Sequence, residues 1–182
     1  VAVAATLGDV SLTWDGPYYM FPVRTYVEWL SVLKRDLLQL RPAHAFSAPV
    51  LEKYWNQFPL DLHPPLGKLA PMLSWRLLHR IVGDILACRV GNAVIFACLV
   101  ALVYLTTAER AGMVGGLFAA ASLILMPRVF AHGHLTAIDV PLAFAWLLVV
   151  LLFWRFSAPT AGTFWPAALA LGLAYGYAVG TK

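Results

Sequence analysis

Residues 90–108 read VGNAVIFACLVALVYLTTA and contain no Asp, Glu, Lys or Arg. Residues 111–127, 140–154 and 156–181 also lack these charged residues. Each stretch is close to the roughly 17 to 25 apolar residues with which a helix crosses a bilayer. A helix is favoured there because it satisfies its own backbone hydrogen bonds in lipid. The sequence therefore predicts an all-α integral membrane protein whose second half forms a multi-span helical bundle of four spans.

The composition of the whole chain supports this class. Of 182 residues, 61% are hydrophobic and only 12% are charged, whereas an ordinary soluble domain has about 25% charged residues. The net charge of +4 is modest, and no alternation of basic and aromatic residues indicates nucleic-acid binding. We therefore expect the lipid bilayer, and no nucleic acid, as a partner.

Two amphipathic segments precede the apolar stretches. Apolar residues recur every three or four positions in residues 19–37 and again in residues 66–82, with charged residues between them. Both segments are too charged to span and are predicted to lie as helices in the membrane interface. We expect residues 1–8 to end a truncated first span, residues 9–89 to form an extracytoplasmic loop with these helices, and residues 90–182 to hold the four spans.

Counting spans predicts which side each polar segment faces. Because an even number of crossings returns the chain to the same side, one compartment receives most of the candidate functional residues: Asp15, Asp61, His63, Lys68, Arg76, Arg128, His132, His134, Asp139 and Lys182. The other side receives only residues 106–112 and 155–163. Arg110 and Arg155 in these short connections favour the cytoplasm under the positive-inside rule. The candidate site is therefore expected on the extracytoplasmic face.

Four cations lie along one stripe of the second amphipathic helix, and the first of them is the last residue of the run DLHPPLGK at residues 61–68. They are Lys68, Arg76, His79 and Arg80. Such a stripe beside the bilayer could hold a lipid phosphate. The alternative is that these side chains reach generic anionic headgroups while their stems cover apolar surface.

Two acids have both a structural and a functional interpretation. Asp139 precedes an apolar helix, so its plainest role is to cap the free N–H groups of that helix as the N-cap residue. Asp15 lies in a WDGP turn that follows an apolar segment, where an interfacial turn alone explains it. A functional role remains equally open for both carboxylates.

Two further motifs are expected to be structural. His132 and His134 could ligate a metal, but two ligands without an obvious third predict no metal site. Gly172, Gly176 and Gly180 recur every four residues, which predicts a small-residue face for close helix packing.

Four segments together resemble a known family. They are WDGPYY at 14–19, DLHPPLGK at 61–68, PRVFAHGHLTAIDVPL at 127–142 and GTK at 180–182. These segments resemble the polytopic, GT-C type glycosyltransferases of the dolichyl-phosphate-mannose protein mannosyltransferase family, and in particular its bacterial members. The resemblance covers residues 13–182 and indicates the N-terminal part of a longer protein.

The resemblance implies an enzyme that transfers a sugar on the extracytoplasmic face of a membrane, most simply the bacterial plasma membrane. The donor would be a polyprenyl-phosphate-linked mannose or a similar hexose or pentose. The acceptor would be a hydroxyl of protein Ser/Thr, of a glycan or of a lipid. The family implies an inverting single displacement that requires no cofactor and no catalytic metal.

The resemblance also assigns roles to individual residues. Asp15 falls at the position of the proposed base, and Asp139 at that of a second acid that orients the acceptor or assists the base. The expected ligands of the donor phosphate are His63, Lys68, Arg76, Arg89 and Lys182.

Two departures from the family pattern stand out. Gly16 follows Asp15 where many relatives have a second acid, and Leu62 stands where some lipid A-modifying relatives have a metal-binding acid.

Two other functions remain open. A membrane transporter would use the acids as intramembrane ion groups. A non-catalytic scaffold that binds lipid through its interfacial helices would tolerate Asp15→Asn.

Overall fold

The computed structural model describes residues 2–11, 16–55, 63–157 and 164–182. The regular structure in these ranges is helical, and they contain no strand, which confirms the predicted all-α class. In order, the helices are α1 (Ala2–Thr6), α2 (Gly16–Leu38), α3 (Pro42–Ala45), α4 (Ala48–Trp55), the 3-10 helix η1 (Leu66–Lys68), α5 (Leu69–Val82), α6 (Asp84–Leu125), α7 (Pro127–His134), α8 (Asp139–Phe156) and α9 (Phe164–Val179).

Both predicted amphipathic segments are helical. The first is α2, and the second is η1 continued by α5. The inner face of α2 buries Val23 and Tyr26 against Met72 of α5 and Cys88 of α6. These helices therefore pack on the base of the long apolar helix.

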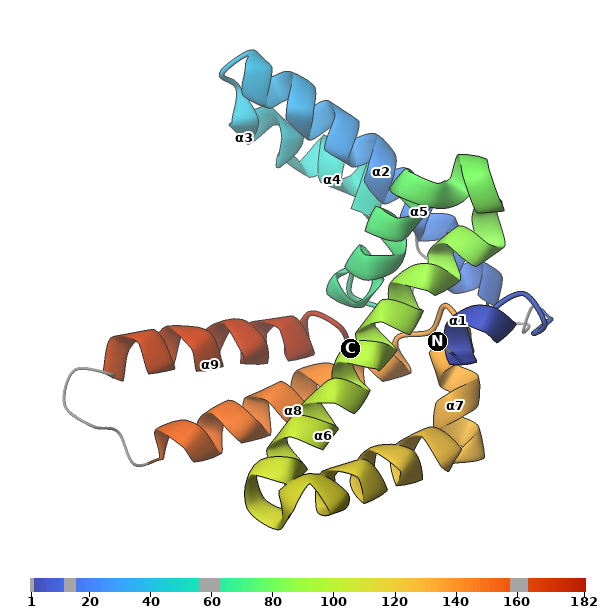
Figure 1. Ribbon diagram of the computed structural model, residues 1–182. Coiled ribbons are helices and arrows are strands. Elements are labelled where there is room, and N and C mark those ends of the chain that lie inside the picture. Colours follow the sequence, from blue (N-terminus) through green and yellow to red (C-terminus); the bar gives the residue numbers. More distant parts are fainter. Residues whose placement is uncertain (1, 12–15, 56–62, 158–163) are drawn as a thin grey trace.

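Helices α3 and α4 were not predicted from the sequence, and they fold back along α2. Figure 1 shows the three helices as an arm that projects from the rest of the molecule. Trp29 of α2 donates its indole N–H to the carbonyl of Ala45 at 2.8 Å, and Tyr26 stacks on Trp55 with ring centroids 4.7 Å apart. At the tip, the ring N–H of His44 donates to the buried Asp36 carboxylate at 2.7 Å, and this hydrogen bond lowers the pKa of Asp36.

The long helix α6 begins at Asp84, earlier than the predicted start of the first apolar span at residue 90, and turns back at Gly112. Gly112 has φ 73° and ψ 174°, a conformation that glycine adopts without the steric penalty of a side chain. By length and composition, two helices of the described ranges could each cross a membrane, α6 and α8, while α9 is a shorter apolar helix of 16 residues. These two helices are compatible with a membrane span, and the count of four spans stays a prediction.

The apolar helices are arranged so that their connections gather at two ends. The guanidinium of Arg110, just before the turn at Gly112, lies 4.9 Å from the ring centroid of Trp154 near the end of α8. Figure 1 shows the loop before α8 and the C-terminal end of α9 at the opposite end of these helices. One end of the bundle therefore holds the short connections, and the other holds the sequence motifs.

The packing face of α9 differs from the predicted one. Ala167, Ala174 and Ala178 are the buried residues of this helix, which packs against α8. A Cβ added at Gly172 or Gly176 would meet nothing within 4 Å. The predicted glycine face is therefore wrong for these two positions, because alanines on another face of the helix make the contact.

Candidate functional site

Three motif segments that are far apart in sequence meet at one place, which we call the junction: residues 63–68, 132–139 and 180–182. The backbone N–H of Leu66 donates to the carbonyl of Gly180 at 2.9 Å. Gly67 is buried, and a Cβ at this position would lie 2.8 Å from Cγ2 of Thr181 and 3.3 Å from Cγ2 of Ile138. This close approach explains why glycine follows the two prolines and the leucine of the motif.

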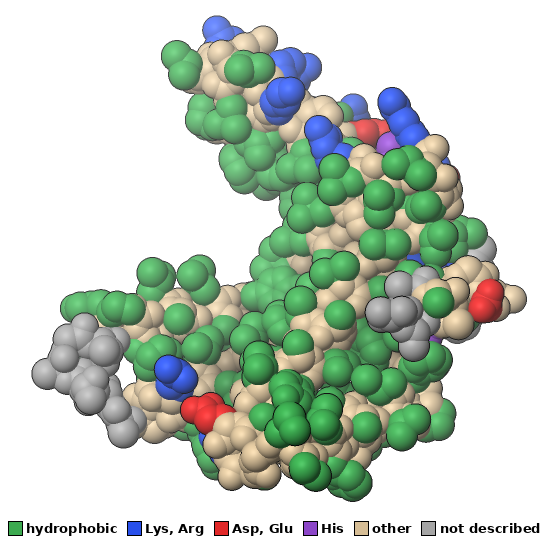
Figure 2. Space-filling model, in the orientation of Figure 1, with side chains coloured by type: hydrophobic (Ala, Val, Ile, Leu, Met, Phe, Trp, Pro, Cys, Tyr) green, Lys and Arg blue, Asp and Glu red, His purple; other side chains and the backbone are tan. Residues whose placement is uncertain are grey.

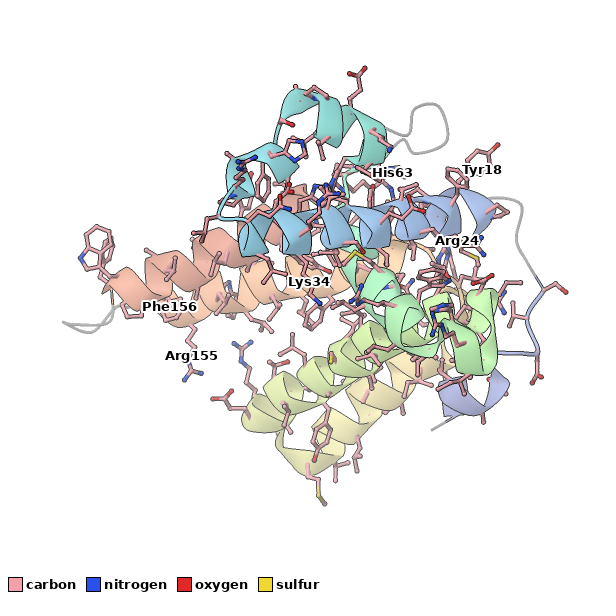
Figure 3. All side chains as sticks on the ribbon, turned by 90° about the horizontal axis from the view of Figure 1, so that it is seen from above. Tyr18, Arg24, Lys34, His63, Arg155 and Phe156 are labelled. Carbon is pink, nitrogen blue, oxygen red and sulfur yellow. The ribbon has the colours of Figure 1, made fainter. Side chains whose placement is uncertain are left out.

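The first segment contains a half-buried histidine whose backbone carbonyl is bonded to a buried lysine. His63 is half-buried, and its ring stacks on Tyr19 of α2 with centroids 5.9 Å apart and an interplanar angle of 16°. Figure 3 shows His63 beside α2. Lys68 is only 1% exposed, and its ammonium donates to the carbonyl of His63 at 3.1 Å. A buried ammonium requires such hydrogen bonds. Lys68 therefore holds the backbone of His63 and places a positive charge next to it.

The second segment ends at Asp139, which is the first residue of α8. Ile138 takes the N-cap position, and no side-chain capping hydrogen bond forms there, so the predicted N-cap role of Asp139 is wrong by one residue. The side chain of Asp139 is 50% exposed, and its Oδ2 lies 3.4 Å from Nδ1 of His132. That contact has the distance of an ion pair without the alignment of a hydrogen bond. The carboxylate is therefore open to a ligand at the rim of the junction.

Asn92 of α6 holds the loop that precedes Asp139. Its side chain is fully buried, and Nδ2 donates to the carbonyls of Leu135 at 2.7 Å and Ala137 at 2.6 Å. Sequence reasoning missed this residue. The available signal was a polar amide side chain within a long apolar stretch, where polar residues are rare. The amide fixes the loop because its NH2 group donates to two carbonyls of the loop at the same time.

Replacing Asn92 by Ala is expected to loosen this loop. Loss of two buried hydrogen bonds should lower the free energy of unfolding by about 2 kcal/mol, at roughly 1 kcal/mol for each bond. Hydrogen exchange of the amides at residues 135–138 should become faster. Thr106→Ala is the matched control, because the Thr106 hydroxyl bonds only to carbonyls of its own helix. Unchanged exchange at 135–138 in the Asn92 variant would show that the amide does not hold the loop.

His134 serves the structure of this end of the bundle. It is 1% exposed, its Nδ1–H donates to the carbonyl of Phe130 at 2.8 Å, and its Nε2 is hydrogen-bonded to the hydroxyl of Thr6 at 2.7 Å. The ring therefore joins α7 to α1.

Arg89 supports the first loop. Its guanidinium is buried and donates to the carbonyls of Leu7 at 2.8 Å, Val10 at 2.6 Å and Ser11 at 3.1 Å. These three carbonyls directly precede the segment that contains Asp15, which lies outside the described residues. Arg89 therefore anchors the chain that leads into the loop of the predicted base.

The remaining predicted cations lie at different distances from the junction. Lys182 is exposed at the end of the third segment, next to the buried Thr181. Arg76 is exposed on α5, and at about 1.5 Å of rise per residue it lies roughly 12 Å along the helix from Lys68. Leu73, about one turn earlier, and the adjacent Leu77 are also exposed, so this part of the α5 surface has the character of an interfacial helix. Of the predicted residues within the described ranges, the structure brings together His63, Lys68, Asp139 and Lys182.

Comparison with known proteins gives one family match. The family described as dolichyl-phosphate-mannose-protein mannosyltransferase matches residues 78–182, more than half of the chain. Neither a curated protein nor a solved structure gives a significant match. The matched region contains Arg89, Asn92 and Asp139, and it ends at Lys182.

Proposed function

The chain belongs to the dolichyl-phosphate-mannose-protein mannosyltransferase family, and on this premise we propose that it transfers a sugar from a polyprenyl-phosphate carrier to a hydroxyl acceptor at the junction. The family makes it a membrane glycosyltransferase. Mannose, or a similar hexose or pentose, is the proposed sugar, and protein Ser/Thr, a glycan or a lipid is the proposed acceptor.

One observation carries the proposal. The motif segments at residues 63–68, 132–139 and 180–182 converge, with Leu66 hydrogen-bonded to Gly180 and with Gly67 packed on Ile138 and Thr181. Their convergence places an open carboxylate, an imidazole and ammonium groups at one end of the apolar helices. This is the set of groups that a glycosyl transfer from a phosphate requires.

The proposed reaction is an inverting single displacement. The acceptor oxygen attacks the anomeric carbon, the bond from that carbon to the phosphate oxygen breaks, and its electron pair leaves with the phosphate. A base must take the proton of the attacking hydroxyl, and we assign that role to Asp15. Support for Asp15 comes from the described residues on either side of it. Arg89 bonds to carbonyls of residues 7–11 before it, and α2 begins at Gly16 directly after it.

Asp139 is proposed to orient the acceptor hydroxyl or to assist the base. Its carboxylate is half exposed, and it stands at the start of a helix whose preceding loop is held by Asn92. The loop therefore fixes where the carboxylate stands while leaving it open to a substrate.

Positive charge near the phosphate stabilises the negative charge that develops as the bond breaks. His63 is the proposed direct ligand. Lys68, which bonds to the backbone of His63, and Lys182, in the adjoining segment of the junction, are proposed to add positive charge. Arg76 is proposed to meet the carrier phosphate at the membrane surface, and Arg89 to act through the first loop that it anchors. A donor with a single phosphate needs no divalent ion to bridge two phosphates, so the displacement is proposed to run without a metal or cofactor.

The proposed site faces the extracytoplasmic side. Support comes from the opposite end of the bundle, where Arg110 and Arg155 lie in or beside short connections and favour the cytoplasm. The transporter alternative is weakened because Asp139 stands at a helix start, not in the middle of an apolar helix. The scaffold alternative predicts that the acids can be replaced without loss of function.

Replacing His63 by Ala tests the donor side of the site. Loss of a charge-assisted hydrogen bond to phosphate is worth about 1.5 to 3 kcal/mol, so the KM for the polyprenyl-phosphate sugar should rise about tenfold or more. The fold should survive because His63 is only half-buried. His44→Ala is the matched control, since that ring bonds to Asp36 at the tip of the projecting arm. A donor titration of the His63 variant that matches the wild type would contradict this role.

A further inference from the structure

A groove lies between α6 and α8, at the end of the bundle opposite the junction. Its volume is about 560 Å³, within the roughly 300 to 1,000 Å³ range of small-molecule sites. Leu102, Leu148, Leu151 and Leu152 provide apolar lining, and Arg110 and Arg155 contribute guanidinium groups. The groove thus combines a surface suited to hydrocarbon with a surface suited to an anion.

The two arginines are held ready for an anion. The guanidinium of Arg110 lies 4.9 Å from the ring centroid of Trp154, a stacking that leaves its N–H donors available. Arg155 extends from the end of α8 on the side that faces α6 (Figure 3). Within the part of the chain that the structure describes, neither arginine forms an ion pair. Glu109 also lines the groove, so the local charge of these three groups is +1.

The position of the groove favours a lipid over a soluble anion. Figure 2 shows basic and acidic side chains close together on the lower part of the molecule, with hydrophobic side chains nearby. Trp154 is 62% exposed, and Trp is enriched where a membrane protein meets the headgroup layer. A free phosphate would contact the guanidinium groups and leave the leucines uncovered.

We propose that this groove binds an anionic glycerophospholipid of the leaflet opposite the junction. The phosphate lies between Arg110 and Arg155, where planar guanidinium groups bind phosphate through paired N–H donors. An acyl chain lies along the leucines. Glu109 accepts a hydrogen bond from a hydroxyl-bearing headgroup, so phosphatidylglycerol is the probe of choice. The site is remote from the acids and cations of the junction and does not depend on the function proposed for them.

Native mass spectrometry of the intact protein titrated with phosphatidylglycerol tests this site. The double variant Arg110→Gln/Arg155→Gln should bind phosphatidylglycerol about tenfold more weakly than the wild type. The wild type should also bind phosphatidylcholine about tenfold more weakly than phosphatidylglycerol. The matched control is Lys34→Gln/Arg41→Gln, which removes the same charge from exposed positions on or beside α2 and should bind like the wild type.

A second measurement uses the unmodified protein. A phosphatidylglycerol with a photoactivatable acyl chain should label residues 148–155, and inorganic phosphate at millimolar concentration should not displace it. Equal affinity of the double variant, equal affinity for phosphatidylcholine, or labelling confined to other segments would overturn the proposal. Displacement by inorganic phosphate would reveal a phosphate site without a lipid, and protection of the groove in a dimer would reveal a second copy as its occupant; either result also overturns the proposal.

Discussion

Asp15→Asn and Asp139→Asn are each expected to reduce sugar transfer at least about a hundredfold in the intact protein, because general acid–base catalysis typically contributes 10²- to 10⁴-fold to a rate. Asparagine has nearly the same shape as aspartate and removes the negative charge. Asp139 is half exposed and makes no capping hydrogen bond, so its replacement should leave the folded state intact.

Initial rates with a radiolabelled polyprenyl-phosphate mannose measure this effect, and the midpoint of thermal unfolding verifies the fold. Glu52→Gln on α4 is the control, since it neutralises an exposed carboxylate on the projecting arm. Turnover near the wild-type rate in the Asp15 variant would contradict its assignment as the base. Turnover near the wild-type rate in both Asp variants would contradict a catalytic role for either acid, whereas a wild-type protein that transfers no sugar would favour the non-catalytic scaffold.

Gly91→Ala should destabilise the protein by about 3 kcal/mol, at the upper end of the cost of overpacking a well-packed interior. A Cβ at Gly91 would lie 2.6 Å from the backbone nitrogen of Pro71 and closer still to the carbonyl group of Ala70. These are backbone atoms of α5, so a side-chain rotation cannot relieve the clash. Helices α5 and α6 would have to separate, and α5 continues from the segment that contains His63 and Lys68.

Gly172→Ala in α9 is the matched control for Gly91→Ala. Both exchanges replace a helical glycine by alanine, which gains about 1 kcal/mol of helix propensity, but a Cβ at Gly172 meets nothing within 4 Å. Thermal unfolding should therefore separate the two variants, with the Gly91 variant less stable and the Gly172 variant equal to the wild type or slightly more stable. Equal midpoints would show that α5 and α6 do not pack as closely as described.

The features that depend on local pattern could be predicted from the sequence. Uncharged apolar stretches indicated membrane helices, and the three- to four-residue spacing in residues 19–37 and 66–82 predicted α2 and α5. The motif segments could be found because their residue types are unusual in an apolar chain. Helices α3 and α4 gave no such signal, because they are short and their stability comes from contacts of Trp29 and Tyr26 with other elements.

The features that depend on distant contacts could not be predicted. Arg89 had the residue type of a phosphate ligand, but only the fold brings its guanidinium to the carbonyls of residues 7–11. Asn92 was not selected because its two acceptors lie more than forty positions away in sequence. The spacing of Gly172 and Gly176 predicted a packing face, but spacing does not determine which side of α9 meets α8.

The central claim is that the first loop and the junction form one site at one membrane surface. Labelling of single cysteines with a membrane-impermeant maleimide tests it in sealed vesicles, after Cys88→Ala and Cys98→Ala remove the native thiols. Asp15→Cys and Asp139→Cys should both react from the extracytoplasmic side, and Arg155→Cys should react only from the other side. Reaction of positions 15 and 139 from opposite sides of the membrane would contradict a shared catalytic centre.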